Sequence, residues 1–323
     1  MSVYVTNARV GKGSGGGIVA LHEIQALQPN PVISISEENP FMNDYCALWC
    51  IRNGSWKTAH FYGAPFGLTA EALKKQGAKI FVTIPAHNLE RSIEEHIKFF
   101  GKYPYPHMTD PRLWSMYTHH YKIADVVICP SQTSADYIKR KLELETTPII
   151  IRHGCDVPQE IMPYPEMFTV GHLSQCGPDK GQTYLIHAWN SLRLPNARIF
   201  IAGAGTEQFG GAGYIPDENV FHRSISIYVQ SSVTEAFGIP VLDAMANARP
   251  IIVTEGAGVH ELIEDGKEGF VVPIRCPDAL AEYIAYFANN PSEIKRMGQN
   301  ARATAEQYTW SRIEAEYKKV YQT

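Results

Sequence analysis

The sequence lacks several features that mark special classes of protein. No run of apolar residues approaches the roughly 20 that a membrane-spanning helix needs. The first residues, Met1-Ser-Val-Tyr-Val-Thr, show no basic segment followed by an apolar one, which is the pattern of a signal peptide. Charged residues make up 19% of the chain and form no long run. We therefore expect a soluble, cytoplasmic protein.

Signatures of metal binding and of disulfides are also missing. The six cysteines are scattered, and no two of them are separated by two residues, which favours reduced core thiols over zinc or disulfides. His119 and His120 are adjacent rather than at helical ligand spacing, so we expect no metal. The formal net charge of −4 gives no overall attraction to nucleic acid or anionic lipid. A local basic patch and a peripheral contact with a membrane stay open.

What the chain does contain is an alternation of β-branched runs and amphipathic stretches, which predicts parallel sheets covered by helices. In the first half we expect strands at 3–5, 31–35, 78–83, 125–129 and 148–152, with helices at 17–27, 70–76, 89–100 and 131–142. In the second half we expect strands at 168–170, 197–202, 225–229, 250–254 and 269–272, with helices at 181–192, 240–248, 277–288, 291–305 and 310–321.

The length of 323 residues suits two domains, and the segment 156–167 is the best linker between them. Its three prolines break the alternation, which restarts afterwards. We expect an α/β protein of two Rossmann-like, doubly wound domains, at 1–157 and 158–306, with a last helix at 307–323. Ligands bind outside the carboxyl ends of the strands in such sheets, so we expect a cleft between the domains there.

The most informative stretch is 231–245, where a strand, a loop and a helix follow one another. Glu235 lies in the loop, Gly238 permits close backbone approach, and Pro240 opens the helix. Free N–H groups at a helix start form an anion site. Asp243 lies one helical turn inside, so a diphosphate could sit between two carboxylates that accept from sugar hydroxyl groups. The alternative is that Glu235 and Asp243 only cap the helix.

The pattern Glu235-x7-Asp243 around Phe-Gly-Ile-Pro-Val-Leu resembles the Glu-x7-Glu motif of the retaining GT-B glycosyltransferases of family 4. The similarity is strong from about residue 168 to the end and weaker over 1–157. Tyr308-Thr-Trp-Ser resembles the start of the family's last helix, which crosses back onto the first domain. Other segments in register are Val170-Gly-His-Leu-Ser, Lys180-Gly, Gly203-x-Gly, Arg249-Pro-Ile-Ile-Val-Thr, Gly256-Ala-Gly-Val-His-Glu-Leu-Ile and Asp265-Gly-Lys-Glu-Gly-Phe-Val-Val.

The resemblance implies a nucleotide-sugar co-substrate, no further cofactor, and a role for each matching residue. Glu235 would contact the donor sugar, Asp243 the ribose, and Lys180 the phosphate charge. The implied catalytic residues are His87, Lys180 and Glu235. The implied donor-binding residues are Gly15, Gly16, Gly17, His172, Lys180, Glu235, Ala236, Phe237, Gly238, Ile239 and Asp243. UDP is our expectation for the nucleotide.

Two positions depart from the family pattern. Asp243 stands where the family usually has Glu, one methylene longer, so its ribose contact could run through water. His172 stands where the family usually has Arg. Histidine is only partly cationic at neutral pH, so a phosphate contact worth about 1.5–3 kcal/mol would be weaker or pH-dependent here.

The first half carries weaker signals. The segment 11–17 could cradle a phosphate or could be a flexible connection, and Gly15 to Gly17 loosely match the family's Gly-Gly. His87 follows a strand and resembles the family's histidine that faces the donor sugar; the alternative is a surface or capping residue. Aromatic and cationic residues at 103–121 are our candidate for the acceptor site. Its members are Tyr103, Arg112, Trp114 and His119.

The implied reaction moves a sugar to an acceptor hydroxyl with retention and without a metal. The helix N–H groups and Lys180 would stabilise the diphosphate as it leaves. A glycan, lipid or small-molecule acceptor is favoured over nucleic acid. The alternatives are a GT-B phosphorylase or sugar-phosphate synthase, transfer to a modified nucleic-acid base, and a non-enzymatic sugar-binding protein. The donor sugar, the acceptor and the oligomeric state cannot be read from the sequence.

Overall fold

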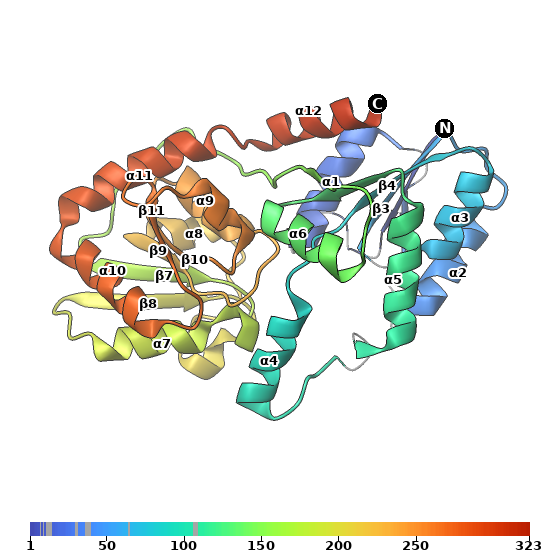
Figure 1. Ribbon diagram of the computed structural model, residues 1–323. Coiled ribbons are helices and arrows are strands. Elements are labelled where there is room, and N and C mark those ends of the chain that lie inside the picture. Colours follow the sequence, from blue (N-terminus) through green and yellow to red (C-terminus); the bar gives the residue numbers. More distant parts are fainter. Residues whose placement is uncertain are drawn as a thin grey trace. The chain divides into compact units, whose positions relative to one another are not determined.

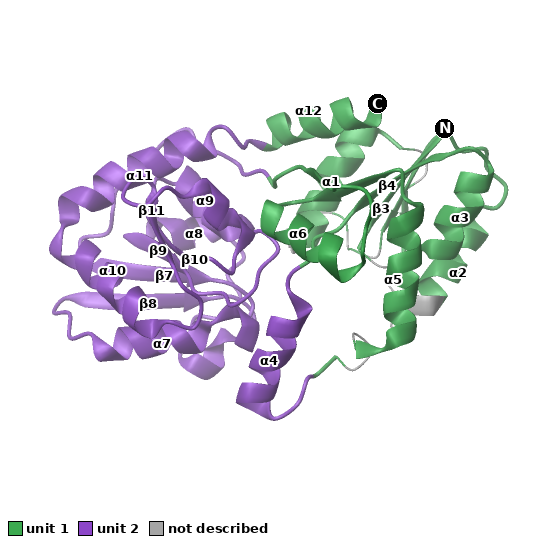
Figure 2. Ribbon diagram, in the orientation of Figure 1, with its two compact units in different colours: residues 1–86, 104–153, 310–323 green, residues 87–103, 154–309 purple. Residues whose placement is uncertain are grey.

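The computed structural model describes residues 1–6, 8, 10, 15–29, 32–35, 40–63, 65–105 and 109–323. The chain divides into two compact units (Figure 2). Unit 1 comprises residues 1–86, 104–153 and 310–323, and unit 2 comprises residues 87–103 and 154–309.

Unit 1 is built on a six-stranded parallel sheet in the order β2-β1-β3-β4-β5-β6 (Figure 1). Its central strands are buried on both faces, as expected of a parallel sheet covered by helices. The strands are β1 (Ser2–Thr6), β2 (Val32–Ser34), β3 (Thr58–Tyr62), β4 (Lys79–Thr83), β5 (Val126–Cys129) and β6 (Ile149–Ile150). The helices are α1 (Gly15–Leu27), α2 (Pro40–Ile51), α3 (Gly67–Lys75), α5 (Pro111–Ile123), α6 (Gln132–Lys141) and α12 (Trp310–Tyr321).

Unit 2 has a five-stranded parallel sheet in the order β11-β10-β9-β7-β8. The order runs outward from β7 in both directions, which is the doubly wound arrangement, and β7 and β9 adjoin at its centre. The strands are β7 (Phe168–Leu173), β8 (Ala197–Ala202), β9 (Ile227–Gln230), β10 (Ile251–Thr254) and β11 (Gly269–Val272). The α-helices are α4 (Leu89–Phe100), α7 (Gln182–Ser191), α8 (Glu218–Arg223), α9 (Ile239–Ala246), α10 (Pro277–Asn289) and α11 (Pro291–Ala305), with short 3-10 turns η2 (Pro178–Lys180), η3 (Thr206–Phe209) and η4 (Gly258–Leu262).

The last helix, α12, belongs to unit 1 and packs on α1. The ring of Trp310 stacks on His22 with 4.1 Å between centroids, and Nδ1 of His22 lies 2.7 Å from Oε1 of Glu314. Tyr317 is buried in the same interface. The expected two Rossmann-like units and the return of the last helix to the first unit are therefore confirmed.

Helix α4 differs from its expected place. The sequence assigned residues 1–157 to one domain, whereas 87–103 belongs to unit 2 (Figure 2). The reason is the face that α4 buries: Phe99 packs on the core of unit 2, and Glu95 is fully buried there. The chain therefore leaves unit 1 after residue 86 and re-enters it at residue 104.

Candidate functional site

The loop that joins β9 to α9 ends in two backbone donors, on the buried Gly238 and the half-buried Ile239. Gly238 is the N-cap of α9 and has φ +112°, in the left-handed region that favours glycine. Among the described residues, no acceptor is hydrogen-bonded to the N–H of Gly238 or of Ile239. A helix start with unpaired N–H groups attracts an anion through those donors and the helix dipole. Unit 2 therefore has the helix start that the anion site requires, and the binding of an anion there stays a prediction.

A second loop, η2, brings Lys180 to the same place. Gly181 follows it with φ +71°, and a Cβ there would lie 1.9 Å from the carbonyl oxygen of Ser231. The N–H of Val233 donates to the carbonyl of Asp179 at 2.8 Å, and the hydroxyl of Ser231 donates to the carbonyl of Lys180 at 3.3 Å. The η2 turn is therefore tied by its backbone to the loop after β9.

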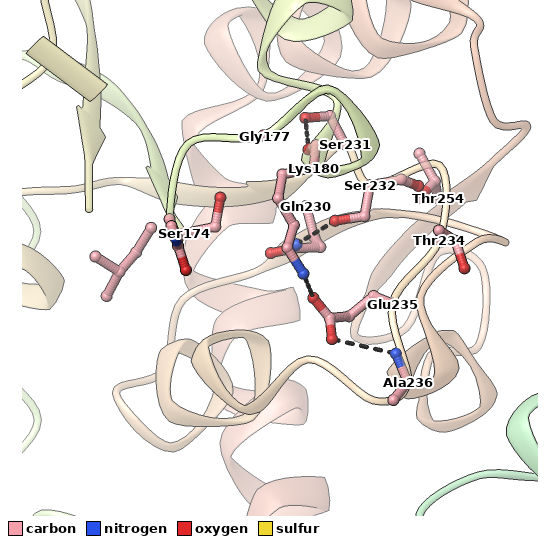
Figure 3. Close-up of polar contacts among 12 residues, drawn as sticks. Ser174, Gly177, Lys180, Gln230, Ser231, Ser232, Thr234, Glu235, Ala236 and Thr254 are labelled. Carbon is pink, nitrogen blue, oxygen red and sulfur yellow. Dashed lines mark hydrogen bonds and ion pairs between the residues drawn. The ribbon is translucent and has the colours of Figure 1, made fainter. Parts of the chain in front are cut away.

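Lys180 and Glu235 form an ion pair at this junction (Figure 3). Their side chains are 25% and 23% exposed, and the other oxygen of Glu235 accepts from the N–H of Ala236 at 3.1 Å. Burial acts against both charges, but the charges of Glu235 and Asp179 raise the pKa of Lys180, and the charge of Lys180 lowers the pKa of Glu235. Both groups are charged at neutral pH.

His87 lies close enough to this pair to be affected by it. Desolvation lowers its pKa, and the charge of Lys180 lowers it further against the opposing charges of Glu235 and Asp179. The residue nevertheless keeps an exposed surface. A neutral imidazole at the edge of an ion pair has one nitrogen that donates and one that accepts.

The position of His87 depends on the start of α4. Asn88 is the N-cap of this helix, and its side-chain oxygen accepts from the N–H of Arg91 at 3.0 Å. The N–H of Asn88 in turn donates to the hydroxyl of Thr234 at 2.8 Å. Thr234 precedes Glu235, so one hydrogen bond joins the residue after His87 to the residue before Glu235.

The structure corrects the expectation for His172. The residue is fully buried, its Nδ1 lies 2.8 Å from the carbonyl of Val229, and its Nε2 lies 2.8 Å from the hydroxyl of Ser174. Because a carbonyl only accepts, Nδ1 carries the proton and Nε2 accepts from Ser174. Burial lowers the pKa of His172 to about 4, so the ring is neutral at pH 7 rather than partly cationic. It orients Ser174 and presents no charge to a ligand.

Asp243 lies one turn into α9, and its half-buried carboxyl group faces other acids. Desolvation raises its pKa well above the ordinary value, and the charges of Glu218 and Asp156 raise it further. A carboxyl group held in its protonated form can donate a hydrogen bond as well as accept one. That property suits a contact with a hydroxyl group.

Other predicted donor-site residues belong to unit 1. Residues 11–14 are outside the described residues, and Gly15 to Gly17 form the first turn of α1 in unit 1. A Cβ on Gly16 would lie 3.2 Å from the hydroxyl oxygen of Tyr62, so this turn is packed against β3. Its role in donor binding stays a prediction.

The four expected acceptor residues are divided between the two units. Tyr103 belongs to unit 2, where its ring meets His96 edge-on at 5.3 Å, while the other three lie on α5 in unit 1. Arg112 pairs with Asp110 at 2.7 Å. In the same unit, Nζ of Lys141 lies 5.1 Å from the ring of Trp114, and Nε2 of His119 lies 3.4 Å from Glu71. Their acceptor role stays a prediction.

Sequence reasoning missed the polar groups that hold the site in shape. Gln182 donates to the hydroxyl of Ser174 at 2.8 Å and to the carbonyl of Gln175 at 3.0 Å. Gln230 donates to Ser232 at 2.6 Å at the end of β9 (Figure 3). Of the supporting residues, only Asp179 could have been found from the sequence. Its carboxylate directly precedes the matched Lys180, which suggests that it influences the charge of that lysine.

Two features are absent from the described part of the chain. No helix there is both long and apolar enough to cross a membrane. No three side chains of the His, Cys, Asp or Glu type converge there in a way that could hold a metal ion.

Comparison with known proteins gives the family that the second half of the chain resembles. Residues 159–304 match the family described as glycosyl transferases group 1. The chain is 28% identical over 187 residues to EpsD of Bacillus subtilis, which is named as a glycosyltransferase; the match covers 53% of this chain and 47% of EpsD. The chain thus spans about half the length of this curated relative.

Solved structures resemble the chain over nearly its whole length. Sucrose-phosphate synthase from Thermosynechococcus elongatus superposes with a TM-score of 0.80 at 16% identity, covering 99% of this chain and 98% of that one. HepE of Anabaena, solved with UDP and glucose, superposes with a TM-score of 0.78 at 16% identity, covering 100% and 99%. At this identity the likeness concerns the fold. The chain therefore has the GT-B fold, and its residues 159–304 match the glycosyl transferases group 1 family.

Proposed function

We propose that the chain is a glycosyltransferase that moves a sugar from a nucleoside-diphosphate-sugar to an acceptor hydroxyl, with retention and without a metal. The observation that carries this proposal is the pair of N–H groups at Gly238 and Ile239, which have no acceptor among the described residues, next to the ion pair of Lys180 and Glu235. These donors and one cation offer the positive environment that a departing diphosphate needs.

The leaving group takes its stabilisation from Lys180 and the start of α9. As the glycosyl–phosphate bond breaks, negative charge grows on the diphosphate. Lys180 is cationic at neutral pH because Glu235 and Asp179 outweigh the burial that disfavours its charge. The neutral His172 adds no cation, so Lys180 bears more of the charge compensation than in a site with arginine at position 172.

Glu235 is proposed to orient the donor sugar rather than to attack it. Its carboxylate is held by Lys180 and by the N–H of Ala236, an arrangement suited to accepting from sugar hydroxyl groups. Retention then needs no protein nucleophile, since the acceptor attacks on the side from which the diphosphate leaves, and the departing phosphate oxygen takes the acceptor proton. His87, neutral at the edge of the pair, is proposed to hydrogen-bond the same sugar.

Asp243 is proposed to contact the ribose hydroxyl groups, and UDP is the proposed nucleotide. The raised pKa of Asp243 favours a carboxyl group that both donates to and accepts from a diol. The structural neighbour HepE was solved with UDP-glucose, which supports a UDP-sugar as the first donor to test. A glycan, lipid or small molecule is the proposed acceptor.

The test is a transfer assay with a panel of UDP- and GDP-sugars and alcohol acceptors, run with and without EDTA. The proposal predicts glycoside formation with at least one donor, an unchanged anomeric configuration by NMR, and no loss with EDTA. Product of inverted configuration, or activity abolished by EDTA and restored by a divalent metal, would contradict the proposed mechanism. Cell fractionation tests the two predictions on location, a cytoplasmic protein and a peripheral membrane contact.

A further inference from the structure

Helix α4 is anchored to unit 2 by a polar cluster about two turns from its N-terminus. Glu95, whose side chain is 1% exposed, accepts from Nε of Arg275 at 2.6 Å and from the hydroxyl of Tyr184 at 2.8 Å. Lys98 donates to the same hydroxyl at 2.8 Å. We call Arg275, Glu95 and Tyr184 the α4 clamp.

Each partner in the clamp comes from an element near the proposed donor site or is held in an unusual conformation. Tyr184 lies on α7, four residues after Lys180, so the surface that receives α4 begins at the η2 turn. Arg275 lies between β11 and α10 and has φ +59°, a left-handed conformation that is costly for a residue other than glycine. Such a conformation persists where surrounding contacts require it, and here its guanidinium reaches Glu95 and Glu94.

The other end of α4 carries His87. The helix rises about 1.5 Å per residue, so the clamp at Glu95 lies about 10 Å from the helix start. Because the helix is rigid, fixing it at Glu95 also fixes the position of its start, where His87 lies. At the helix start, the hydrogen bond from Asn88 to Thr234 adds a second attachment next to Glu235.

We infer that the α4 clamp is the positioning device that holds His87 beside the Lys180–Glu235 pair. This histidine then belongs to the proposed nucleotide-sugar site of unit 2, although the chain just before it lies in unit 1 (Figure 2). Arg275 and Glu95 are positioning residues, since neither contacts the pair. The catalytic consequence rests on the proposed function; the placement of His87 does not.

The first test is the titration of His87, followed by NMR in the full chain and assigned through the signal lost in His87→Ala. The groups that face His87 are Lys180, Glu235, Asp179 and His96. Arg275→Met should loosen α4, take His87 away from the surroundings that lower its pKa, and move that pKa up toward the ordinary value. Glu94→Gln is the matched control, because Glu94 pairs with the same arginine but its side chain is 62% exposed; it should leave the titration unchanged.

The second test is kinetic and separates positioning from general stability. Arg275→Met should lower kcat by about tenfold or more, in line with the cost of misplacing a catalytic group, with little change in the Kd for UDP. In the His87→Ala background the same substitution should lower kcat no further, although it lowers the melting temperature by the same amount. Arg275→Lys should restore part of the loss.

The inference is overturned if folded Arg275→Met leaves the His87 titration unchanged, or if the losses from His87→Ala and Arg275→Met multiply. If Arg275→Met does not fold, Glu95→Gln is measured in its place with the same two outcomes. Absence of transfer with every nucleotide-sugar would count against the proposed function, and the NMR titration would still decide the placement of His87.

Discussion

Two glutamates, one in each unit, show how neighbours decide what a buried carboxyl group does. Glu23 in α1 is fully buried against the hydroxyl of Tyr4, and Nε2 of His60 lies 3.5 Å away. Burial raises the pKa of Glu23 to about 7, despite hydrogen bonds from nearby hydroxyl groups, of which Thr83 contributes most. Burial lowers the pKa of His60 to about 3, so no cation offsets the carboxylate.

Glu235 in unit 2 has the opposite arrangement. A lysine stands beside it, its side chain is 23% exposed, and its pKa is lowered. A neutral network of acid, phenol and imidazole fixes the packing of α1 and β1 in unit 1. The ion pair in unit 2 holds charge in a partly exposed position, next to N–H groups that have no acceptor in the part of the chain that the structure describes. The comparison indicates that a buried acid alone is no sign of a binding site, and that the neighbouring cation and N–H donors are what single out Glu235 for the proposed one.

The largest effect is expected when the cation beside Glu235 is removed. Lys180→Met should lower kcat/KM by about 10²–10³-fold, or about 2.7–4 kcal/mol, because the charge is needed as the leaving group forms. The variant should also raise the pKa of Glu235, whose lowered value depends on Lys180. Steady-state kinetics measure the first effect. Lys267→Met, which removes an exposed lysine paired with Glu264, is the control; near-normal turnover by Lys180→Met would exclude the assigned role.

The next effect concerns the pH dependence of unit 1. The pKa of Glu23 is raised from 4.5 to about 7, so between these values the folded state holds a proton that the unfolded state has lost. The protonated Glu23 therefore stabilises the folded state fully below pH 4.5, and this stabilisation is lost as pH rises through 7. The free energy of unfolding falls by about 3 kcal/mol over that range.

Glu23→Gln should remove that dependence, so the variant gains stability relative to wild type as pH rises from 5 to 8.5. Amide exchange in β1 at both pH values measures it. Glu145→Gln, on the exposed surface of the same unit, should show no such trend. A constant difference between Glu23→Gln and wild type across this range would contradict a protonated Glu23.

A smaller effect is expected when one glycine in each unit is replaced by alanine and the losses of stability are compared. Gly181→Ala combines a φ of +71° with a Cβ 1.9 Å from the carbonyl of Ser231, and it should cost about 2–3 kcal/mol of stability and displace Lys180. Gly77→Ala in unit 1 has φ +86° but open space around its Cβ, so it should cost only about 1 kcal/mol. Denaturant unfolding compares them; equal costs would mean that the contact with Ser231 does not constrain the site.

The smallest effect is expected at the pair of His22 and Glu314 between α1 and α12. Both side chains are partly exposed, at 17% and 22%, so Glu314→Gln should change stability by less than about 1 kcal/mol. Trp310→Ala, which removes the ring stacked on His22, should cost more. If the charge change had the larger effect on thermal unfolding, the return of α12 would depend on the ion pair rather than on packing.

The parts of the fold that depend on local sequence could be predicted. The helix expected at 89–100 has the predicted bounds, because its apolar residues recur at helical spacing and Asn88 caps it. The start of α9 could likewise be predicted, from Gly238 and Pro240. Strand β3 and helix α2 were missed, since Thr58-Ala-His-Phe-Tyr places a histidine in a buried strand and only contacts with distant residues explain it.

The parts of the structure that depend on contacts between distant residues could not be predicted. Glu95 and Arg275 are 180 residues apart, and nothing near either one indicates that α4 joins unit 2. The charge of His172 likewise follows from its burial and from its hydrogen bonds to Val229 and Ser174, not from its type. Sequence patterns therefore indicated which residues to consider, while protonation states and the grouping of α4 required the folded chain.

The most direct test of the central claim is a crystal structure of the chain with UDP. The account predicts that oxygens of the diphosphate lie at hydrogen-bond distance, about 2.7–3.2 Å, from the backbone nitrogens of Gly238 and Ile239, with Nζ of Lys180 on the same group. A diphosphate bound elsewhere, with those two N–H groups making no contact to it, would contradict the account.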